Sequence, residues 1–264
     1  MKKAVFFDID GTLIDAAHGM PHMSEASRQA IRSLQAAGHY TFIASGRPYA
    51  FLDPELLAFG FDGYVLMNGA AVMMGDQVIY KQTLPMDFID EVCSACDARG
   101  VEYLFEGLYH VYTKNARGRL ARFYEALSIP TTCLVTDFAA SHIDVFKMEF
   151  NAVDSQGAAV YDQFQSDQIR GMRYPLFQGE WGFELYARSE TKGSGILHAL
   201  SYLGIPVENS FAFGDGDNDF EMMTTVGTSL VMGNAQPALK EAGDYIVPTV
   251  TDDGVAAGIT QYIL

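Results

Sequence analysis

The chain has 264 residues, of which 49% are apolar and 19% charged, a balance typical of a folded globular protein and not of a disordered one. The formal net charge of −16 argues against nucleic acid as a partner, since phosphate backbones are bound by clustered Lys and Arg side chains. Three cysteines are too few for a disulfide framework, and no apolar run reaches the length of a signal peptide core or a membrane helix, so we expect a cytoplasmic protein without a membrane partner.

Residues 1–82 alternate between short apolar runs and amphipathic segments. The apolar runs are rich in β-forming residues and predict buried strands at residues 3–9, 39–44 and 62–67. Ser24 can cap a helix that ends at Gly38, and a second, short helix is predicted at residues 53–59. Gly75 and Asp76 predict a turn between two extended segments, at residues 70–74 and 77–80.

The segment from residue 83 to residue 187 has a different pattern. Its strands are amphipathic and separated by short turns, which is typical of an α+β layer with one open sheet face. Helices are predicted at residues 86–99, 119–127 and 155–164, and strands at 101–106, 109–113, 145–151 and 182–187.

The first pattern returns at Thr191. A helix over residues 191–203 is predicted to face inward with Ile196, Leu197, Leu200 and Leu203. Further buried strands are predicted at residues 210–213 and 228–232, with a helix at 219–225 between them.

Buried strands that alternate with helices predict an α/β fold with a doubly wound parallel sheet and right-handed crossovers. Because this pattern is interrupted once, the chain divides into a discontinuous core and an insert. The core is predicted to comprise residues 1–82 and 188–264, and the inserted α+β domain residues 83–187.

Asp8 and Asp10 stand at the end of the first predicted strand. The two-residue period of a strand points both carboxylates to one side, so both can enter one site. Ligands of parallel sheets bind beyond the carboxyl ends of the strands, where these side chains would lie. The competing interpretation is an ordinary Asp-Gly turn beside a solvated carboxylate.

The loop at residues 214–219 follows another buried strand and contains three aspartates and an asparagine. Carboxylate and amide oxygens are the ligands that a hard cation prefers. An EF-hand does not fit, because the sixth position counted from Asp215 is Phe220 and the twelfth is Val226. A solvated acidic loop is the alternative interpretation.

Two further stretches could hold a phosphoryl group. Ser45, Gly46 and Arg47 follow the second strand and offer a hydroxyl, a backbone N–H and a guanidinium, although a turn with a surface arginine would look the same. Lys192 begins a predicted helix, at the end where the helix dipole favours anions, which indicates another partner such as a carboxylate cluster. A solvent-exposed lysine is the plainer alternative.

Taken in order, these stretches resemble the haloacid dehalogenase-like (HAD) phosphohydrolase superfamily, most of all its Cof-type branch with a large α/β cap. The matching segments are Asp8-Ile-Asp10-Gly-Thr-Leu, Ile43-Ala-Ser45-Gly-Arg47-Pro, Thr191-Lys192-Gly193 and Phe213-Gly-Asp215-Gly-Asp-Asn218-Asp219-Phe-Glu-Met, with further matches at Asn68-Gly69-Ala70, Val231-Met-Gly-Asn-Ala235 and Asp252-Asp-Gly-Val255. The resemblance implies a Rossmann-like catalytic core and a cap formed by the insert.

The resemblance also implies a phosphatase that uses Mg²⁺ and forms an aspartyl phosphate on Asp8. Asp10 would act as general acid and base, and this second carboxylate is the reason to prefer a phosphatase to a dehalogenase. Mg²⁺ would be held by Asp8, the backbone carbonyl of Asp10 and Asp215. Phosphate-binding and supporting roles are implied for Ser45, Gly46, Lys192 and Asn218, for Asp219 as the residue that orients Lys192, and for Arg47.

The expected substrate is a small phosphorylated metabolite, most of all a sugar phosphate, and the expected state is a monomer or a weak homodimer. Two alternatives stay open. A phosphomutase or phosphotransferase of the same superfamily would pass the phosphoryl group to a sugar instead of water, and a non-catalytic sugar-phosphate sensor would bind without turnover. The enzymatic interpretation requires Asp8 and Asp215 to lie within reach of one cation, with Lys192 directed at them.

Overall fold

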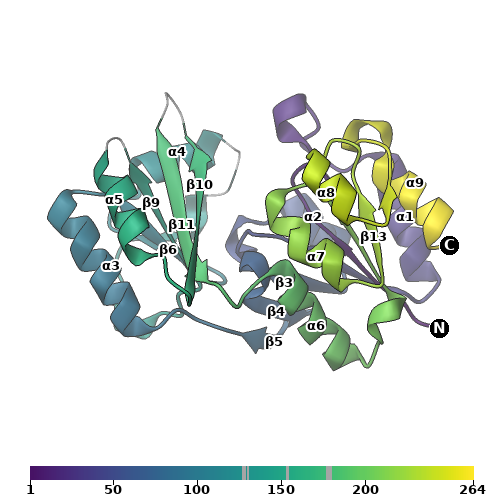
Figure 1. Cartoon of the computed structure of the whole chain (residues 1–264), viewed down its shortest axis with the longest axis horizontal. Helices are drawn as coiled ribbons and strands as arrows, with labels where there is room; N and C mark the ends of the chain where they lie inside the picture. The colour runs from purple at the N-terminus through teal and green to yellow at the C-terminus, as the bar shows by residue number, and fades with distance from the viewer. Residues whose placement is uncertain (127–128, 130, 153–154, 177–179) are drawn as a thin grey trace. The chain divides into compact units, whose positions relative to one another are not determined.

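The chain forms two compact units in the computed structural model, which describes residues 1–126, 129, 131–152, 155–176 and 180–264 (Figure 1). The first unit comprises Met1–Gly46, Pro54–Lys81 and Thr191–Leu264, and the second Arg47–Asp53 and Gln82–Glu190. Residues 47–53, which the sequence assigned to the core, group with the second unit because Phe51 is buried in an apolar cluster with Leu104 and Tyr124.

The first unit is built on an eight-stranded sheet in the order β14-β13-β12-β1-β2-β3-β4-β5. Six of its strands run parallel: β1 (Ala4–Phe7), β2 (Tyr40–Ala44), β3 (Gly63–Leu66), β12 (Ser210–Gly214), β13 (Thr228–Val231) and β14 (Tyr245–Ile246). The remaining two form an antiparallel extension, β4 (Ala71–Met74) and β5 (Gln77–Lys81). The predicted α/β class is confirmed, with a hairpin added at one edge of the parallel sheet.

Helices pack on this sheet through alternate strand residues. The helices of the unit are α1 (Glu25–Ala36), α2 (Pro54–Phe59), α6 (Lys192–Leu203), α7 (Phe220–Thr225), α8 (Pro237–Ala242) and α9 (Gly254–Tyr262). Phe6 and Phe42 stack on one face of the sheet and belong to the same buried cluster as Ile196 of α6 and Met222 of α7. The Ser24 side chain accepts a hydrogen bond from the backbone N–H of Ser27, as expected of the cap that begins α1.

The prediction for α6 is wrong at one position. Ile196 and Leu200 are buried as expected, but 47% of Leu197 is exposed. A helix rotates by about 100° per residue, so the residue after Ile196 leaves the face that packs on the sheet. Helices α8 and α9 and strand β14 were not predicted.

The second unit contains a six-stranded sheet in the order β10-β11-β9-β6-β7-β8. Its strands are β6 (Tyr103–Glu106), β7 (Val111–Thr113), β8 (Leu134–Val135), β9 (Lys147–Ala152), β10 (Ile169–Pro175) and β11 (Trp181–Ala187), and its helices α3 (Met86–Arg99), α4 (Arg119–Ala126) and α5 (Ser155–Phe164). One face of the sheet is apolar, and its Phe150 and Leu185 share a cluster with Val92 of α3 and Val160 of α5. Leu127, the last residue of the helix predicted at 119–127, lies outside the described residues.

The opposite face of this sheet holds a buried group of charges. The ammonium of Lys147 lies 3.0 Å from a carboxylate oxygen of Glu106, 3.0 Å from one of Glu184 and 3.3 Å from one of Glu149. The strand register pairs Lys147 with Glu106 and Glu149 with Glu184, which places all four side chains on one face. Burial raises the pKa of Glu149 and of Glu184, and the carboxylates around Lys147 raise its pKa despite burial.

None of the helices among the described residues is both long enough and apolar enough to cross a lipid bilayer.

Candidate active site

The predicted site residues of the first unit follow neighbouring strands of its sheet. Asp8 comes directly after β1, Ser45 after β2 and Asp215 after β12, and these three strands are adjacent and parallel. Asn68 follows β3, the next strand across the sheet. The carboxyl ends of the strands therefore deliver these side chains to a single edge, the usual ligand-binding edge of such sheets.

Three aspartates converge there. Asp8, Asp215 and Asp219 each offer a carboxylate oxygen within 4.8 Å of the others. The backbone N–H of Asp8 donates to the carbonyl of Phe213 at 3.0 Å, which fixes the first carboxylate beside the loop that carries the other two. Burial raises the pKa of Asp8, against the opposing effect of Lys192, and it raises the pKa of Asp215 to about 6.

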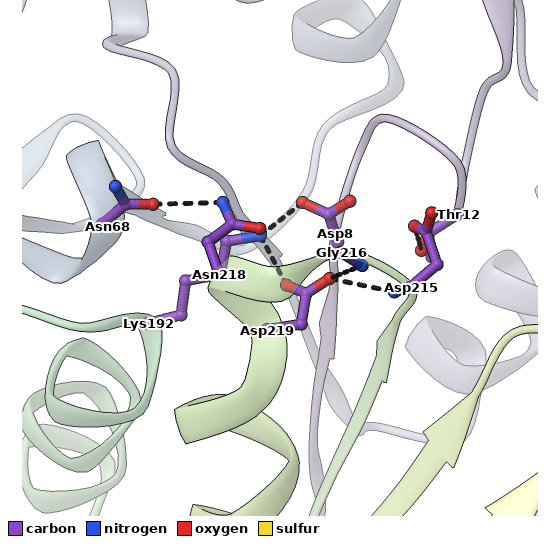
Figure 2. A network of polar contacts seen from close by, with 8 residues as sticks. All are labelled: Asp8, Thr12, Asn68, Lys192, Asp215, Gly216, Asn218 and Asp219. Carbon is purple, nitrogen blue, oxygen red and sulfur yellow. Dashed lines mark hydrogen bonds and ion pairs between the residues drawn. The ribbon is translucent and has the colours of Figure 1, made fainter. Parts of the chain in front are cut away.

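Lys192 closes this group from the side of α6 (Figure 2). The side chain is fully buried, and its ammonium lies 2.5 Å from Asp8 Oδ1 and 2.6 Å from Asp219 Oδ1. The Thr191 side chain caps the helix by accepting from the backbone N–H of Ser194, which sets the position of Lys192 at the first turn. Burial lowers the pKa of Lys192, but the two carboxylates raise it more, so the ammonium stays charged.

Asp219 also organises the loop that contains it. Its Oδ2 accepts hydrogen bonds from the backbone N–H groups of Asp215 and Gly216, each at 2.9 Å, while Oδ1 contacts Lys192. One buried carboxylate therefore holds both the lysine and the turn that presents Asp215. Asp217, in the same turn, is exposed.

The Asp215 carboxylate is held at both of its oxygens. The hydroxyl of Thr12 donates to Oδ1 at 2.9 Å, and the side-chain amide of Asn234 donates to Oδ2 at 3.2 Å. Gly11 has a φ of +85°, and a Cβ at this position would lie 2.0 Å from Asp215 Oδ2. Only glycine fits here, because both the backbone conformation and the space exclude a side chain.

A second group of polar residues lies beside the aspartates. The Asn218 side-chain amide donates to Asn68 Oδ1 at 3.2 Å, as Figure 2 shows. A Cβ on Gly46 would lie 3.0 Å from Asn68 Oδ1 and 3.4 Å from Asn218 Nδ2, so the Ser45–Gly46 turn runs directly against this pair. Asn68 has a φ of +54°, in the left-handed region that asparagine tolerates better than most residues.

Two predicted site residues are placed differently. The side chain of Asp10 is exposed and lies outside the group of three carboxylates, although its charge adds to the effect of burial on the pKa of Asp215. Arg47 belongs to the second unit, where its guanidinium donates to the carbonyl of Phe51 at 3.3 Å.

Thr12, Asn68 and Asn234 were not among the predicted site residues. All three lie inside the segments that carried the resemblance, and Asn68 follows a predicted buried strand as Asp8 and Asp215 do. That placement was the available signal for Asn68.

Gly69 fixes the turn after β3 against the start of α6. Its φ is +97°, and a Cβ would lie 2.0 Å from the carbonyl oxygen of Thr191. We expect Gly69→Ala to lower the free energy of unfolding by about 3 kcal/mol or more, from the left-handed backbone and the clash together. Gly38→Ala is the control, because Gly38 has a similar φ of +81° with open space around it, and it should cost only about 1–2 kcal/mol. Equal losses in urea unfolding would contradict the clash.

Comparison with known proteins identifies the family. The family model of haloacid dehalogenase-like hydrolases matches residues 5–259. This chain is a haloacid dehalogenase-like hydrolase. The resemblance drawn from the motifs is confirmed, and so is the enzyme class expected from it, a phosphoric monoester hydrolase.

Relatives of this HAD-like hydrolase align along its whole length. YkrA of Bacillus subtilis, described as a candidate phosphatase, is 30% identical over 98% of this chain and 97% of its own. The 5-amino-6-(5-phospho-D-ribitylamino)uracil phosphatase YitU of the same organism is 24% identical over 98% of this chain and 96% of its own.

Solved structures confirm the HAD fold. A hypothetical protein of Geobacillus kaustophilus HTA426 matches with a TM-score of 0.87 at 25% identity, over 99% of this chain and 98% of that one. BT4131, a sugar phosphatase of HAD subclass IIB, matches with a TM-score of 0.81 at 28% identity, over 99% of both chains.

Proposed function

We propose that this HAD-like hydrolase is a Mg²⁺-dependent phosphatase that hydrolyses small phosphorylated metabolites, sugar phosphates above all, through an aspartyl phosphate on Asp8. The observation that carries the proposal is the convergence of Asp8, Asp215 and Lys192 from three distant parts of the chain. A site that only bound phosphate would not need the Asp8 carboxylate in contact with Lys192, since the negative charge of the carboxylate repels the phosphate.

The residues present fit a hard divalent cation. The donor set is made of carboxylate oxygens, and burial together with the neighbouring carboxylates raises the pKa of Asp8 and of Asp215, as expected where negative charges gather out of contact with water. Asp8, Asp215 and the backbone carbonyl of Asp10 would hold Mg²⁺. When bound, the ion would neutralise phosphoryl oxygens and keep Asp8 ionised.

In the proposed reaction, the ionised Asp8 carboxylate attacks phosphorus and forms a new P–O bond as the bond to the leaving alkoxide breaks. Protonated Asp10 gives its proton to the alkoxide. Water then attacks the phosphorus of the aspartyl phosphate and Asp10 takes its proton. The bond between Asp8 and phosphorus breaks, which releases inorganic phosphate and restores both carboxyl groups.

The remaining predicted residues would stabilise the phosphoryl group. The Lys192 ammonium, the Ser45 hydroxyl, the Gly46 backbone N–H and the Asn218 amide are donors for its oxygens as charge spreads over them. Asp219 would act through Lys192, whose ammonium it contacts at 2.6 Å. We assign the first unit as the catalytic core and the second, which includes Arg47, as the cap.

Phosphate release from a panel of sugar phosphates, nucleotides, pyridoxal phosphate and flavin mononucleotide, with Mg²⁺ present, tests the proposal. We expect sugar phosphates to react fastest, with water as the only acceptor required. The Asp8→Asn variant is the blank for each compound. Release from none of them would contradict the phosphatase, and turnover only with an added sugar acceptor would indicate a phosphotransferase.

Removal of the metal is expected to weaken phosphate binding strongly and to stop turnover. Without a divalent cation, a bound phosphate would meet the three negative carboxylates of Asp8, Asp215 and Asp219. Two like charges in contact near a protein surface repel each other by about 4 kcal/mol, and the Lys192 ammonium would be left to oppose this repulsion. We expect EDTA to weaken binding of inorganic phosphate by about 100-fold or more, measured by titration calorimetry with and without Mg²⁺. Equal affinity in EDTA would show that the cation does not hold the phosphate.

A further inference from the structure

Asn234 connects three segments at the edge of the aspartate group. Its side-chain amide nitrogen donates to the carbonyl of Gly11 at 2.8 Å and to Asp215 Oδ2 at 3.2 Å. Its Oδ1 accepts from the backbone N–H of Val250 at 3.0 Å. The residue lies three positions after β13, so one short side chain joins its own loop to the segments that follow β1, β12 and β14.

The side chain is exposed, although its amide makes all three of these bonds. An exposed asparagine is normally solvated and free to rotate, and fixing it loses side-chain entropy without burying apolar surface. Backbone hydrogen bonds fix the loop that carries Asn234. The N–H of Met232 donates to the carbonyl of Gly214, and the N–H of Gly233 donates to the carbonyl of Pro248. The loop is therefore built to hold this amide against Asp215.

The chemistry of the amide suits a carboxylate that must also bind a cation. Thr12 and Asn234 each donate one hydrogen bond, to different oxygens of Asp215, and each carboxylate oxygen can accept a further partner. Both donors are neutral. A lysine or arginine in the place of Asn234 would pair with Asp215 and oppose a second cation, whereas an amide orients the carboxylate and leaves its charge available.

We propose that Asn234 is a positioning residue of the cation site: its amide, anchored on the Gly11 carbonyl, fixes the Asp215 carboxylate in the orientation that binds the divalent ion. The inference rests on the proposed function, since it assumes that Asp215 is a ligand. Loss of a hydrogen-bonding partner behind a metal ligand typically weakens metal affinity by about 10- to 100-fold.

The test is the Kd of Mg²⁺ for the full chain, measured by titration calorimetry without substrate. We expect Asn234→Ala to raise the Kd by about tenfold or more. Asn234→Ser keeps a small polar side chain and serves as a second variant if the alanine variant folds poorly. Asn209→Ala is the matched control, because Asn209 is a half-buried asparagine just before β12, at the opposite end of the strand from Asp215. The Kd of Mg²⁺ for this variant should equal that of the wild type.

The thermal midpoint in EDTA separates positioning from a purely structural role. If Asn234 only stabilised the loop through its hydrogen bond to Val250, the variants would unfold at a lower thermal midpoint while their Mg²⁺ affinity stayed within about twofold of the wild type. That result would overturn the inference. A raised Kd in a variant that is folded in EDTA supports it. Absence of Mg²⁺ binding by the wild type would instead defeat the proposed function itself.

Discussion

Asp8→Asn is expected to lower the rate of phosphate release by about 10⁴-fold or more, with the protein still folded. The substitution keeps the shape of the side chain but removes the oxygen nucleophile, so no aspartyl phosphate can form. Folding should survive because burial already disfavours the ionised carboxylate, as its raised pKa indicates, and Lys192 keeps its contact with Asp219 at 2.6 Å. Initial rates and circular dichroism measure the two halves of this prediction.

Asp217→Asn provides the matched control in the neighbouring loop. It removes one carboxylate by the same chemical change, but Asp217 is exposed and lies outside the aspartate group, so we expect the wild-type rate. Acid quenching with ³²P-labelled substrate adds a direct readout, since the wild type should retain protein-bound label and Asp8→Asn should retain none. Label on the Asp8→Asn protein, or release at more than about a hundredth of the wild-type rate, would rule out Asp8 as the nucleophile.

Elements with strong local signals were predicted almost residue by residue. The helix at residues 86–99 was predicted with the bounds of α3, because Pro85 precedes it and Gly100, with a φ of +65°, ends it. β10 was not predicted. It lies at the edge of its sheet and its residues are mostly exposed or half-buried, so the sequence lacks the apolar alternation that marks a strand.

The candidate site was predictable where one motif carried several polar groups. Asp8, Asp215 and Lys192 were chosen because each stands at a strand end or helix start, and the structure brings them together. Asn234 could not be found that way. Its partners Asp215 and Gly11 are 19 and 223 residues distant, and only the fold makes those loops neighbours.

The buried charges of the second unit could not be predicted for the same reason. Glu106, Lys147 and Glu184 lie on three different strands, and nothing local marks them as buried. Within the described part of the chain, two oxygens of Glu106 and one of Glu184 have no hydrogen-bonding partner, although Lys147 forms ion pairs with both residues. Lys147 is thus the central compensating charge for several carboxylates, and its loss should have a large effect.

We expect Lys147→Met to lower the free energy of unfolding of the second unit by about 3–5 kcal/mol at pH 8, as breaking a buried ion pair commonly does. Methionine keeps much of the volume of the lysine stem but leaves the carboxylates of Glu106, Glu149 and Glu184 uncompensated. Trp181, the single tryptophan of the chain, lies on β11 of this unit, so its fluorescence in urea reports the unfolding directly. Lys114→Met is the control, because Lys114 is an exposed lysine whose ion pair with Asp97 should contribute at most about 1 kcal/mol.

The loss of unfolding free energy in Lys147→Met should become smaller as the pH falls. Burial raises the pKa of Glu149 and of Glu184 above their unfolded values, so the folded state binds protons more tightly and becomes less stable as the pH rises through these pKa values. Removing Lys147 takes away a charge that lowers the pKa of Glu184, which strengthens this dependence. We therefore expect the loss at pH 5 to be about half that at pH 8 or less. A loss independent of pH would indicate that Lys147 stabilises the sheet by packing and not by charge.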